Sequence, residues 1–235
     1  MSGAPELGGP DLHPVAVDTV LFGVQDAVLK VLLIQRGVAP AAGRWALPGG
    51  FVRGRERLED AVNRELLEEA GVVPDRLVQL GAFSGPHRDL RWVEGAERRV
   101  LSIAFMGLVR VEEHLPRADT DAAAAAWFAL GEVPPLAFDH AEIVSAAHAR
   151  LLDWVRTEPV GLALLPTAFS LTALQALYEA LLGVVLDKRN FRRKALASGL
   201  LCDTGATQRG VPHRAARLYT FDSNAFSERG RSLFG

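Results

Sequence analysis

The chain has 235 residues, 49% hydrophobic and 23% charged, with a formal net charge of −2 at pH 7, which is typical of a globular protein with one large domain or two small ones. Its one cysteine, Cys202, excludes an intrachain disulfide and a cysteine-based zinc cluster. Residues 1–158 hold 16 Lys and Arg against 23 Asp and Glu, a net −7, whereas residues 159–235 hold 10 against 5, a net +5. This asymmetry indicates two modules, of which the second suits a polyanionic partner.

Residues 1–13 are rich in Gly and Pro and lack the apolar segment of a signal peptide, so we expect a flexible tail and a cytoplasmic protein. The run from 160 to 186 carries one charge, Glu179, but Pro166 and several polar side chains interrupt it. A membrane-spanning helix needs about twenty mostly apolar residues in a row, so we expect no membrane partner.

The front part alternates strand-like and helix-like segments. Two β-rich runs separated by Gln25-Asp26 predict a hairpin. The five alanines at 122–126 alone favour a helix, yet we expect a strand at 124–129 that includes three of them and Trp127. Asp139 is a natural N-cap for a helix that extends to about Arg156. The expected strands are 15–23, 28–35, 77–83, 99–109 and 124–129, and the expected helices are 57–70 and 139–156.

The first of these helices carries carboxylates where an amphipathic helix would carry Leu or Ala. Helical spacing places Leu58, Val62, Glu65 and Glu69 on one stripe, with Glu68 close by. Like charges at this spacing repel. The cluster is stabilised if a hard divalent cation such as Mg²⁺ lies over it, because Mg²⁺ takes oxygen ligands. The alternative is a solvated helix face with an Arg64–Glu68 ion pair.

The surrounding spacing favours the metal. The stretch contains Gly50, Glu56, Arg64-Glu65-Leu66, Glu68-Glu69 and Gly71-Val72 at the intervals of the Nudix box, which this sequence therefore resembles. The resemblance implies an α/β/α sandwich that holds a nucleoside diphosphate linked to another group. It also implies that Glu65 and Glu69 ligate Mg²⁺ or Mn²⁺, that Glu68 and the Gly49–Gly50 backbone assist, and that Arg64 and Glu56 lock the loop against the helix.

Further ligand contacts are expected at predicted strand ends. Four arginines flank these ends, where they would contact a diphosphate or form surface salt bridges: Arg36, Arg44, Arg88 and Arg91. Trp45 or Phe83 would stack on an adenine unless it belongs to the core. His140 either supports the pocket or caps its helix.

The back part begins after a junction at 158–166. A helix from about Ser170 to Leu182 ends at Gly183, a basic helix follows Asp187, and strands at 200–203 and 217–221 flank a Gly-rich loop. This order is typical of a winged helix-turn-helix, in which the second helix enters the DNA major groove. The alternative is a solvated basic face, with Phe191 in the core under either interpretation. The expected DNA-contacting residues are Thr172, Lys188, Arg189, Asn190, Arg192, Arg193, Lys194, Arg214 and Arg217, with Arg209 a further basic residue of the wing.

The two parts together resemble the Nudix-related transcriptional regulators of the NrtR family. The resemblance rests on the box, on residues 136–140, on the basic stretch 186–194 and on residues 214–219, where Ala215 replaces a frequent proline. It implies an α+β protein with a Nudix domain at 14–157, a winged helix-turn-helix at 165–222, and tails at 1–13 and 223–235. It further implies a homodimer that binds a two-fold double-stranded DNA operator, senses ADP-ribose or a similar nucleoside diphosphate derivative, and represses NAD-related or sugar-related genes.

The alternative function is an active Mg²⁺-dependent ADP-ribose pyrophosphatase in which DNA binding is secondary. Hydrolysis needs a metal and usually a further carboxylate as base. The loop 112–121 offers four candidates, Glu112, Glu113, Asp119 and Asp121, and the sequence selects none of them. We expect both functions to coexist, with regulation the main one, hydrolysis slow, and the helix at 139–156 transmitting the ligand signal.

Overall fold

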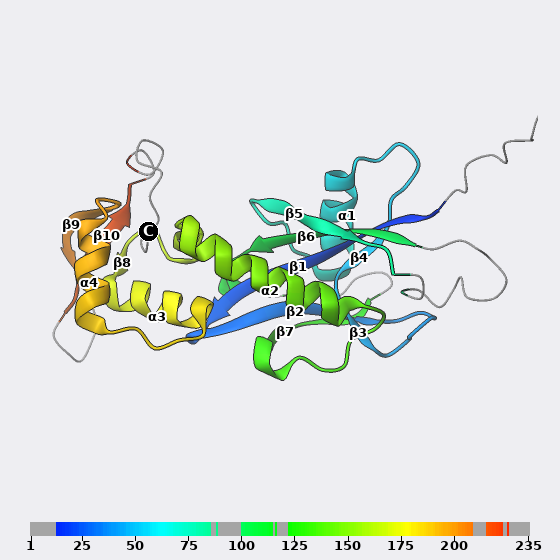
Figure 1. Cartoon of the computed structure of the whole chain (residues 1–235), viewed down its shortest axis with the longest axis horizontal. Helices are drawn as coiled ribbons and strands as arrows, with labels where there is room; N and C mark the ends of the chain where they lie inside the picture. Colours follow the sequence, from blue (N-terminus) through cyan, green and yellow to red (C-terminus); the bar gives the residue numbers. More distant parts are fainter. Residues whose placement is uncertain are drawn as a thin grey trace, which may run out of the picture.

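A computed structural model of the chain describes residues 13–85, 88, 100–114, 116, 122–208, 215–222 and 225. Within these residues, seven strands form one mixed sheet of order β3-β2-β1-β6-β5, with β4 paired to β1 and β7 paired to β2 (Figure 1). The pairing of β1 with β6 is parallel, and the other pairings are antiparallel. The strands are β1 (Val15–Gln25), β2 (Val28–Arg36), β3 (Trp45–Ala46), β4 (Gly49–Phe51), β5 (Leu77–Phe83), β6 (Leu101–Leu108) and β7 (Ala122–Ala129).

Helices cover both faces of this sheet, as the expected α/β/α sandwich requires. Side chains alternate along a strand, so Val20 and Phe22 pack towards α2 (His140–Thr157), whereas Val17 and Leu21 pack towards α1 (Leu58–Ala70). Figure 1 shows α1 and α2 on opposite sides of β1 and β2. The sandwich predicted from the box is confirmed.

Most predicted elements are present, and the differences have local causes. The hairpin of β1 and β2 is confirmed, with Gln25 opposite Val28. The alanine-rich segment is strand β7, because pairing along β2 supplies a ladder of backbone hydrogen bonds that outweighs the helix propensity of alanine. The short strands β3 and β4 were not predicted. Short 3₁₀ helices lie at Val111–Glu113 (η2), Leu130–Glu132 (η3) and Val160–Leu164 (η4).

The back part has the predicted helix, turn, basic helix and hairpin. Ser170 accepts a hydrogen bond from the Ala173 amide (3.1 Å), and Asp187 accepts one from the Asn190 amide (2.7 Å), so each caps the N-terminus of its helix. The strand predicted at 200–203 extends to Thr207. The elements are β8 (Phe169–Ser170), α3 (Leu171–Leu182), α4 (Lys188–Ala197), β9 (Leu201–Thr207) and β10 (Arg217–Phe221), with the strands in the order β8-β10-β9.

One apolar core runs through both parts of the chain. A single cluster of buried side chains includes Phe22 of β1, Trp154 of α2, Tyr178 of α3, Phe191 of α4 and Tyr219 of β10. Helix α3 packs against α2 and against the β1–β2 hairpin. The winged helix therefore docks directly on the sandwich.

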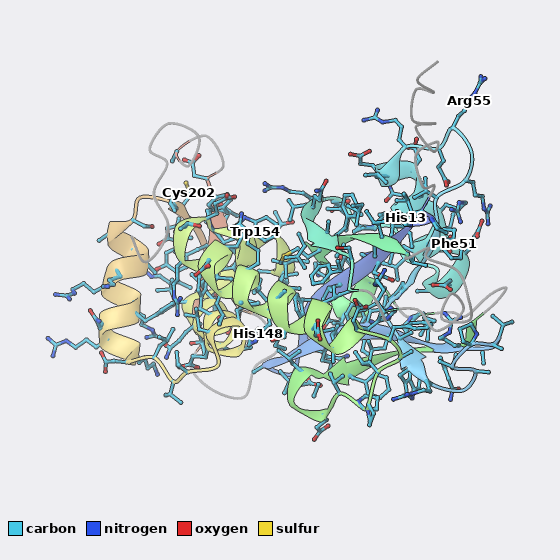
Figure 2. The ribbon with its side chains drawn as sticks, turned by 45° about the vertical axis from the view of Figure 1, so that its right-hand side comes forward. His13, Phe51, Arg55, His148, Trp154 and Cys202 are labelled. Carbon is cyan, nitrogen blue, oxygen red and sulfur yellow. The ribbon has the colours of Figure 1, made fainter. Side chains whose placement is uncertain are left out.

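A cavity of about 370 Å³ lies at this junction. It is lined by Trp154 and Glu158 at the end of α2, by Leu162 of η4, by Glu113 of η2 and by Phe221 of the wing. In Figure 2, Trp154 lies between Cys202 of the wing and Phe51 at the far end of the sandwich. None of the described helices combines the length and the apolar character that a membrane crossing requires.

Candidate functional site

A second cavity, of about 540 Å³, lies at the opposite end of the sandwich from the winged helix and is lined by Phe51 (Figure 2). Its walls come from β1, β2, the β4 turn, α1 and the start of α2. Seven of the predicted site residues lie in these walls: Arg36, Gly50, Glu65, Glu68, Glu69, Arg88 and His140.

The acidic stripe of α1 faces this cavity. Glu65 and Glu69 are 9% and 8% exposed, and Val62 on the same stripe is fully buried, so the solvated-face alternative is wrong for these two glutamates. Burial raises the pKa of Glu69 to about 8, and the nearby Glu65 adds to the shift, whereas a hydrogen bond from the Gly49 amide (2.8 Å) opposes it. Burial also raises the pKa of Glu65.

The glycine turn lets the backbone approach these carboxylates. A Cβ atom at Gly50 would lie 2.3 Å from Oε1 of Glu65, and one at Gly49 would lie 2.2 Å from the Val17 carbonyl oxygen. A larger residue at Gly49 would displace strand β1, and one at Gly50 would displace the Glu65 carboxylate. The turn is therefore built around the acidic cluster.

Arg64 ties the loop to the helix. Its Nε and Nη2 donate to the two oxygens of Glu56 at 2.7 and 2.9 Å, and Nη2 also donates to the Phe51 carbonyl at 3.1 Å. The hydrogen bonds from Arg64 hold the pKa of Glu56 at about 2. Arg64 also contacts Glu65 and lies 3.5 Å from Glu68, so the Arg64–Glu68 pair exists beside the acidic cluster rather than instead of it.

These residues fit a hard divalent cation. Two buried carboxylates whose pKa values are raised face one cavity beside a tight backbone turn, and burial disfavours their charged forms unless a cation compensates. Glu68 is more exposed and is held by Arg53 at 3.3 Å. Among the described residues, no three His, Cys, Asp or Glu side chains are gathered around one point. Two carboxylates would hold a hard divalent cation whose other ligands are oxygens of water or of a bound ligand.

A buried ionic network forms another part of the cavity wall, and sequence reasoning missed its centre, Asp18. Arg88 binds Asp18 through Nη2 (2.9 Å) and Asp139 through Nε and Nη2 (both 2.9 Å). Ser102 donates its hydroxyl to Asp18 at 2.5 Å. Burial opposes ionisation of Asp18, but the positive charge of Arg88 and the hydrogen bonds from Ser102 and Arg88 hold its pKa below the ordinary value. The available signal was one acidic residue inside the apolar run of β1.

His140 completes this network. Its Nδ1 accepts a hydrogen bond from the Leu47 amide (2.8 Å), and its Nε2 lies 3.4 Å from Asp18. Burial lowers the pKa of His140, so the ring is neutral with its proton on Nε2. His140 therefore supports the pocket, and the idea that it caps α2 is wrong.

The structure also corrects the expectations for Arg88 and Asp139. The Arg88 side chain is only 5% exposed, so its ion pairs are buried rather than on the surface. Asp139 stands at the N-cap position of α2 as predicted, but its side chain makes no capping hydrogen bond, because Arg88 holds it.

The aromatic predictions were partly wrong. Trp45 packs edge-on against Phe128 at 4.7 Å and does not line the cavity, so it is not placed to stack on a base there. The phenylalanine rings that line the cavity are those of Phe51 and Phe138, neither of which was predicted as a stacking residue, and the Arg36 guanidinium lies over Phe138 at 5.1 Å. Phe83 and Arg44 line an adjoining hollow of about 660 Å³, which shares Arg88 and Phe138 with the first cavity. Arg91 lies outside the described residues.

Two of the four candidate bases, Glu112 and Glu113, lie in η2, away from the acidic cavity. Glu113 lines the junction cavity and pairs with Arg110, and Glu112 precedes it in the same short helix, beyond the far end of β6. Neither residue lines the acidic cavity, so both are wrong as candidates for the base. Asp119 and Asp121 lie outside the described residues.

The basic helix α4 presents its charges to solvent. Phe191 is buried as expected, whereas Lys188, Arg189, Asn190, Arg193 and Lys194 are exposed.

Two contacts shape this surface. Arg192 donates to the exposed Thr172 hydroxyl at the start of α3 (3.1 Å), and Arg193 donates to Asn190 (2.8 Å). Arg217 of β10 is paired with Asp203 at 3.1 Å. Arg209 and Arg214 lie outside the described residues.

Comparison with known families matches both parts. The NUDIX domain family matches residues 12–147, and the NrtR DNA-binding winged helix domain family matches residues 161–221. The ADPR responsive transcriptional repressor NtrR of Acinetobacter baylyi is 33% identical over 211 residues, which cover 88% of this chain and 81% of that protein. The ADP-ribose pyrophosphatase of Methanocaldococcus jannaschii is 42% identical over 134 residues, covering 57% of this chain and 72% of that protein.

Solved structures are similar both to the whole chain and to its front part alone. The crystal structure of Shewanella oneidensis NrtR complexed with a 27mer DNA has a TM-score of 0.75 and 33% sequence identity, covering 91% of this chain and 95% of that chain. The cocrystal structure of the NUDIX domain of the same protein with ADP ribose has a TM-score of 0.55 and 32% identity, covering 63% of this chain and 94% of that chain.

Proposed function

This chain belongs to the Nudix family and carries an NrtR winged helix domain, and from that premise we propose that it is a transcriptional repressor that ADP-ribose, or a similar nucleoside diphosphate derivative, controls. The observation that carries the proposal is the presence of an acidic cavity of about 540 Å³ and an exposed basic helix on one continuous core. The relatives that respond to ADPR or are bound to DNA and to ADP ribose support it.

The domain boundaries that we propose are 14–157 for the Nudix domain and 165–222 for the winged helix-turn-helix, with tails at 1–13 and 223–235. The family matches at 12–147 and 161–221 support this division. We further propose that the protein acts as a homodimer on a two-fold operator that controls NAD-related or sugar-related genes. A regulator of this kind works where the chromosome lies, which we propose is the cytoplasm.

In the Nudix domain we assign the divalent metal to Glu65 and Glu69, with Glu68 assisting. Members of the family generally use a divalent metal ion, and we propose Mg²⁺ or Mn²⁺ here. When bound, the metal neutralises diphosphate charge and polarises water. The chain itself fixes the carboxylates: the Gly49 amide orients Glu69, and Arg64 orients Glu65 while Glu56 holds Arg64. Arg36, Arg88 and His140 complete the wall that we propose meets the ligand.

The alternative is a working pyrophosphatase in which DNA binding is secondary, and the similarity to the archaeal ADP-ribose pyrophosphatase favours it. We propose that both activities coexist and that hydrolysis is slow. The described part of the cavity offers Asp18 as a further carboxylate, but Arg88, Ser102 and His140 already bind it.

We expect the affinity for Mg²⁺ to rise with pH. Because a metal must displace the proton that Glu69 holds below about pH 8, binding should weaken about tenfold for each pH unit below that value. The same raised pKa makes the metal-free protein lose stability as pH rises from the unfolded-state pKa of Glu69 towards about 8, where added Mg²⁺ should restore it. Calorimetric titration at about pH 6.5 and about pH 8.5 measures the first effect. Glu69→Gln is the control, since it has no proton to displace.

We expect ADP-ribose to release the protein from DNA. The protein first selects a duplex from a random-sequence library, and fluorescence anisotropy then measures its binding to that duplex with and without ADP-ribose and Mg²⁺. A fall of about tenfold or more in affinity is a coupling within the ordinary range for allostery. If no DNA sequence is enriched, the proposal that the protein is a transcriptional repressor is wrong, and the alternative, an ADP-ribose pyrophosphatase, is the one that stands.

Arg193→Ala is the matched variant for this experiment, because Arg193 is exposed on α4 and its removal leaves the core intact. If Arg193 contacts a phosphate, affinity falls and the slope of log affinity against log salt decreases by about one. Lys30→Ala serves as a control, since Lys30 lies on β2 and bonds to Gln25. An equal effect of both variants would contradict a DNA-contacting role for α4.

A further inference from the structure

The start of α2 lacks the cap that its sequence supplies. Asp139 occupies the N-cap position, but its side chain makes no capping hydrogen bond. Ser170 and Asp187, at the corresponding positions of α3 and α4, both cap their helices. An N-cap aspartate ordinarily accepts a hydrogen bond from the second or third amide of the helix. Here the third amide, that of Glu142, already donates to the Asp139 backbone carbonyl (2.9 Å), so the cap would go to the Ala141 amide.

Arg88 binds the Asp139 side chain, and the Asp139 backbone (φ −94°, ψ 16°) is not in the extended conformation that Ser170 and Asp187 adopt. The Arg88 guanidinium donates to both carboxylate oxygens of Asp139 at 2.9 Å and also reaches Asp18 at the same distance. Asp18 and Asp139 together carry two negative charges against the single charge of Arg88. Asp139 is the more exposed of the two carboxylates, 14% against 9%, so it is the partner that can leave at lower cost.

Arg88, although its side chain is only 5% exposed, lies in the path of a ligand. It lines the acidic cavity and the adjoining hollow that contains Arg44 and Phe83, so a molecule that extends across both passes over this guanidinium. Phosphate oxygens bind a guanidinium in the same bidentate geometry as a carboxylate does. A diphosphate is therefore a direct competitor of Asp139 for Arg88.

Helix α2 connects the site of this competition for Arg88 with the winged helix. Its first residue, His140, lines the acidic cavity, and its last turns carry Trp154 and the following Glu158, which line the junction cavity together with Phe221 of the wing. At 1.5 Å per residue, the 18 residues of α2 span about 27 Å. A change in the order of its first turn therefore acts on a rod whose other end touches the winged helix.

We propose that a diphosphate ligand takes the Arg88 guanidinium from Asp139 and that the released carboxylate then caps α2. This inference rests on the proposed function and specifies how its ligand acts. The two states are an uncapped α2 with Asp139 on Arg88 and a capped α2 with the diphosphate on Arg88. The ligand shifts the balance because only the second state offers it Arg88. A cap of ordinary strength changes a helix equilibrium by about two- to thirty-fold.

Two substitutions at Asp139 separate the states. Asp139→Ser can cap α2 but forms no ion pair with Arg88, so without any ligand it should bind the selected duplex about two- to thirty-fold more weakly than the unsubstituted protein. Asp139→Ala can do neither, so it should retain tight DNA binding and lose most of its release by ADP-ribose. Fluorescence anisotropy measures both, and thermal melting checks that both variants fold. Equal DNA affinity of the two variants would overturn the exchange.

A second measurement follows the helix itself. Hydrogen exchange at the Ala141 amide should slow when ADP-ribose and Mg²⁺ are added to the unsubstituted protein and should not slow in Asp139→Ala. Calorimetry of the same samples reports whether ADP-ribose binds. If calorimetry shows that ADP-ribose binds but the Ala141 amide is not protected, the proposed transfer of Arg88 from Asp139 to the diphosphate is wrong, while the proposed function stands. If ADP-ribose does not bind, that part of the proposed function fails, and inorganic pyrophosphate is the probe: protection by pyrophosphate supports the exchange, and its absence overturns it.

Discussion

Replacing Arg88 with methionine is expected to lower the free energy of unfolding by about 3–5 kcal/mol, the usual result of removing one partner from a buried ionic network. Methionine has a similar length and is apolar, so the loss comes from charge rather than from an empty space. Asp18 would remain buried beside Asp139 with no guanidinium to compensate it. Urea unfolding at about pH 7.5, followed by circular dichroism, measures the change.

Arg44→Met is the matched control, because Arg44 is exposed at the edge of the adjoining hollow. Its effect should stay within about 0.5 kcal/mol, as for most surface substitutions. Without Arg88 the pKa of Asp18 should rise, since burial then dominates. A carboxyl whose pKa rises on folding stabilises the protein at low pH and loses that contribution as pH increases, so the deficit of Arg88→Met should shrink at about pH 5. A deficit below about 1 kcal/mol at neutral pH would show that the network is not buried as described.

The double substitution Glu65→Gln with Glu69→Gln is expected to reduce any metal-dependent cleavage of ADP-ribose by at least about a hundredfold, because the metal contributes several kcal/mol of charge stabilisation. Amide groups keep the size of the side chains but are poor ligands for Mg²⁺. DNA binding without ligand should be unchanged, since α4 and the acidic cavity lie in different parts of the chain. Product formation and fluorescence anisotropy on the same preparation separate the two outcomes.

Glu68→Gln is the comparison for that experiment. Glu68 lines the cavity but is 34% exposed and is held by Arg53, so a smaller loss of cleavage is expected. Release of DNA by ADP-ribose should weaken in the double variant, because the diphosphate loses its metal. If the double variant lost DNA binding as completely as cleavage, the division of labour between the two domains would be wrong.

Local pattern was sufficient to predict the elements that carry their own signal. The spacing of Glu65 and Glu69 on one helical stripe placed both on the buried face of α1, where the structure has them. The run of cations around Phe191 likewise placed that ring in the core and the charges outside. Each of these predictions depends on residues within one or two turns of a helix, and helical periodicity is a local property.

The network around Arg88 was beyond this kind of reasoning. Its contacts to Asp18 and Asp139 join residues separated by 70 and 51 positions, and no local pattern encodes which distant strands become neighbours. The same limit explains why Glu112 and Glu113 were considered as bases. Their place in the chain after β6 did not reveal that this end of the strand faces the winged helix instead of the acidic cavity. The prediction that Trp45 stacks on an adenine was wrong for a more local reason. The pairing of β3 with β2 decides on which side of the sheet the ring lies, and there it packs against Phe128.

The core that α3 shares with the sandwich has a consequence for protein engineering. Leu174 and Tyr178 are fully buried in the cluster that also holds Phe22 and Trp154, so the winged helix is not a detachable module. Excised alone or grafted onto a foreign sensor, it would expose these faces and lose about 1.5–3 kcal/mol for each large apolar side chain left in water. Chimeras should therefore retain α2 and the β1–β2 hairpin with the winged helix and exchange only the cavity walls that α1 and the β4 turn supply.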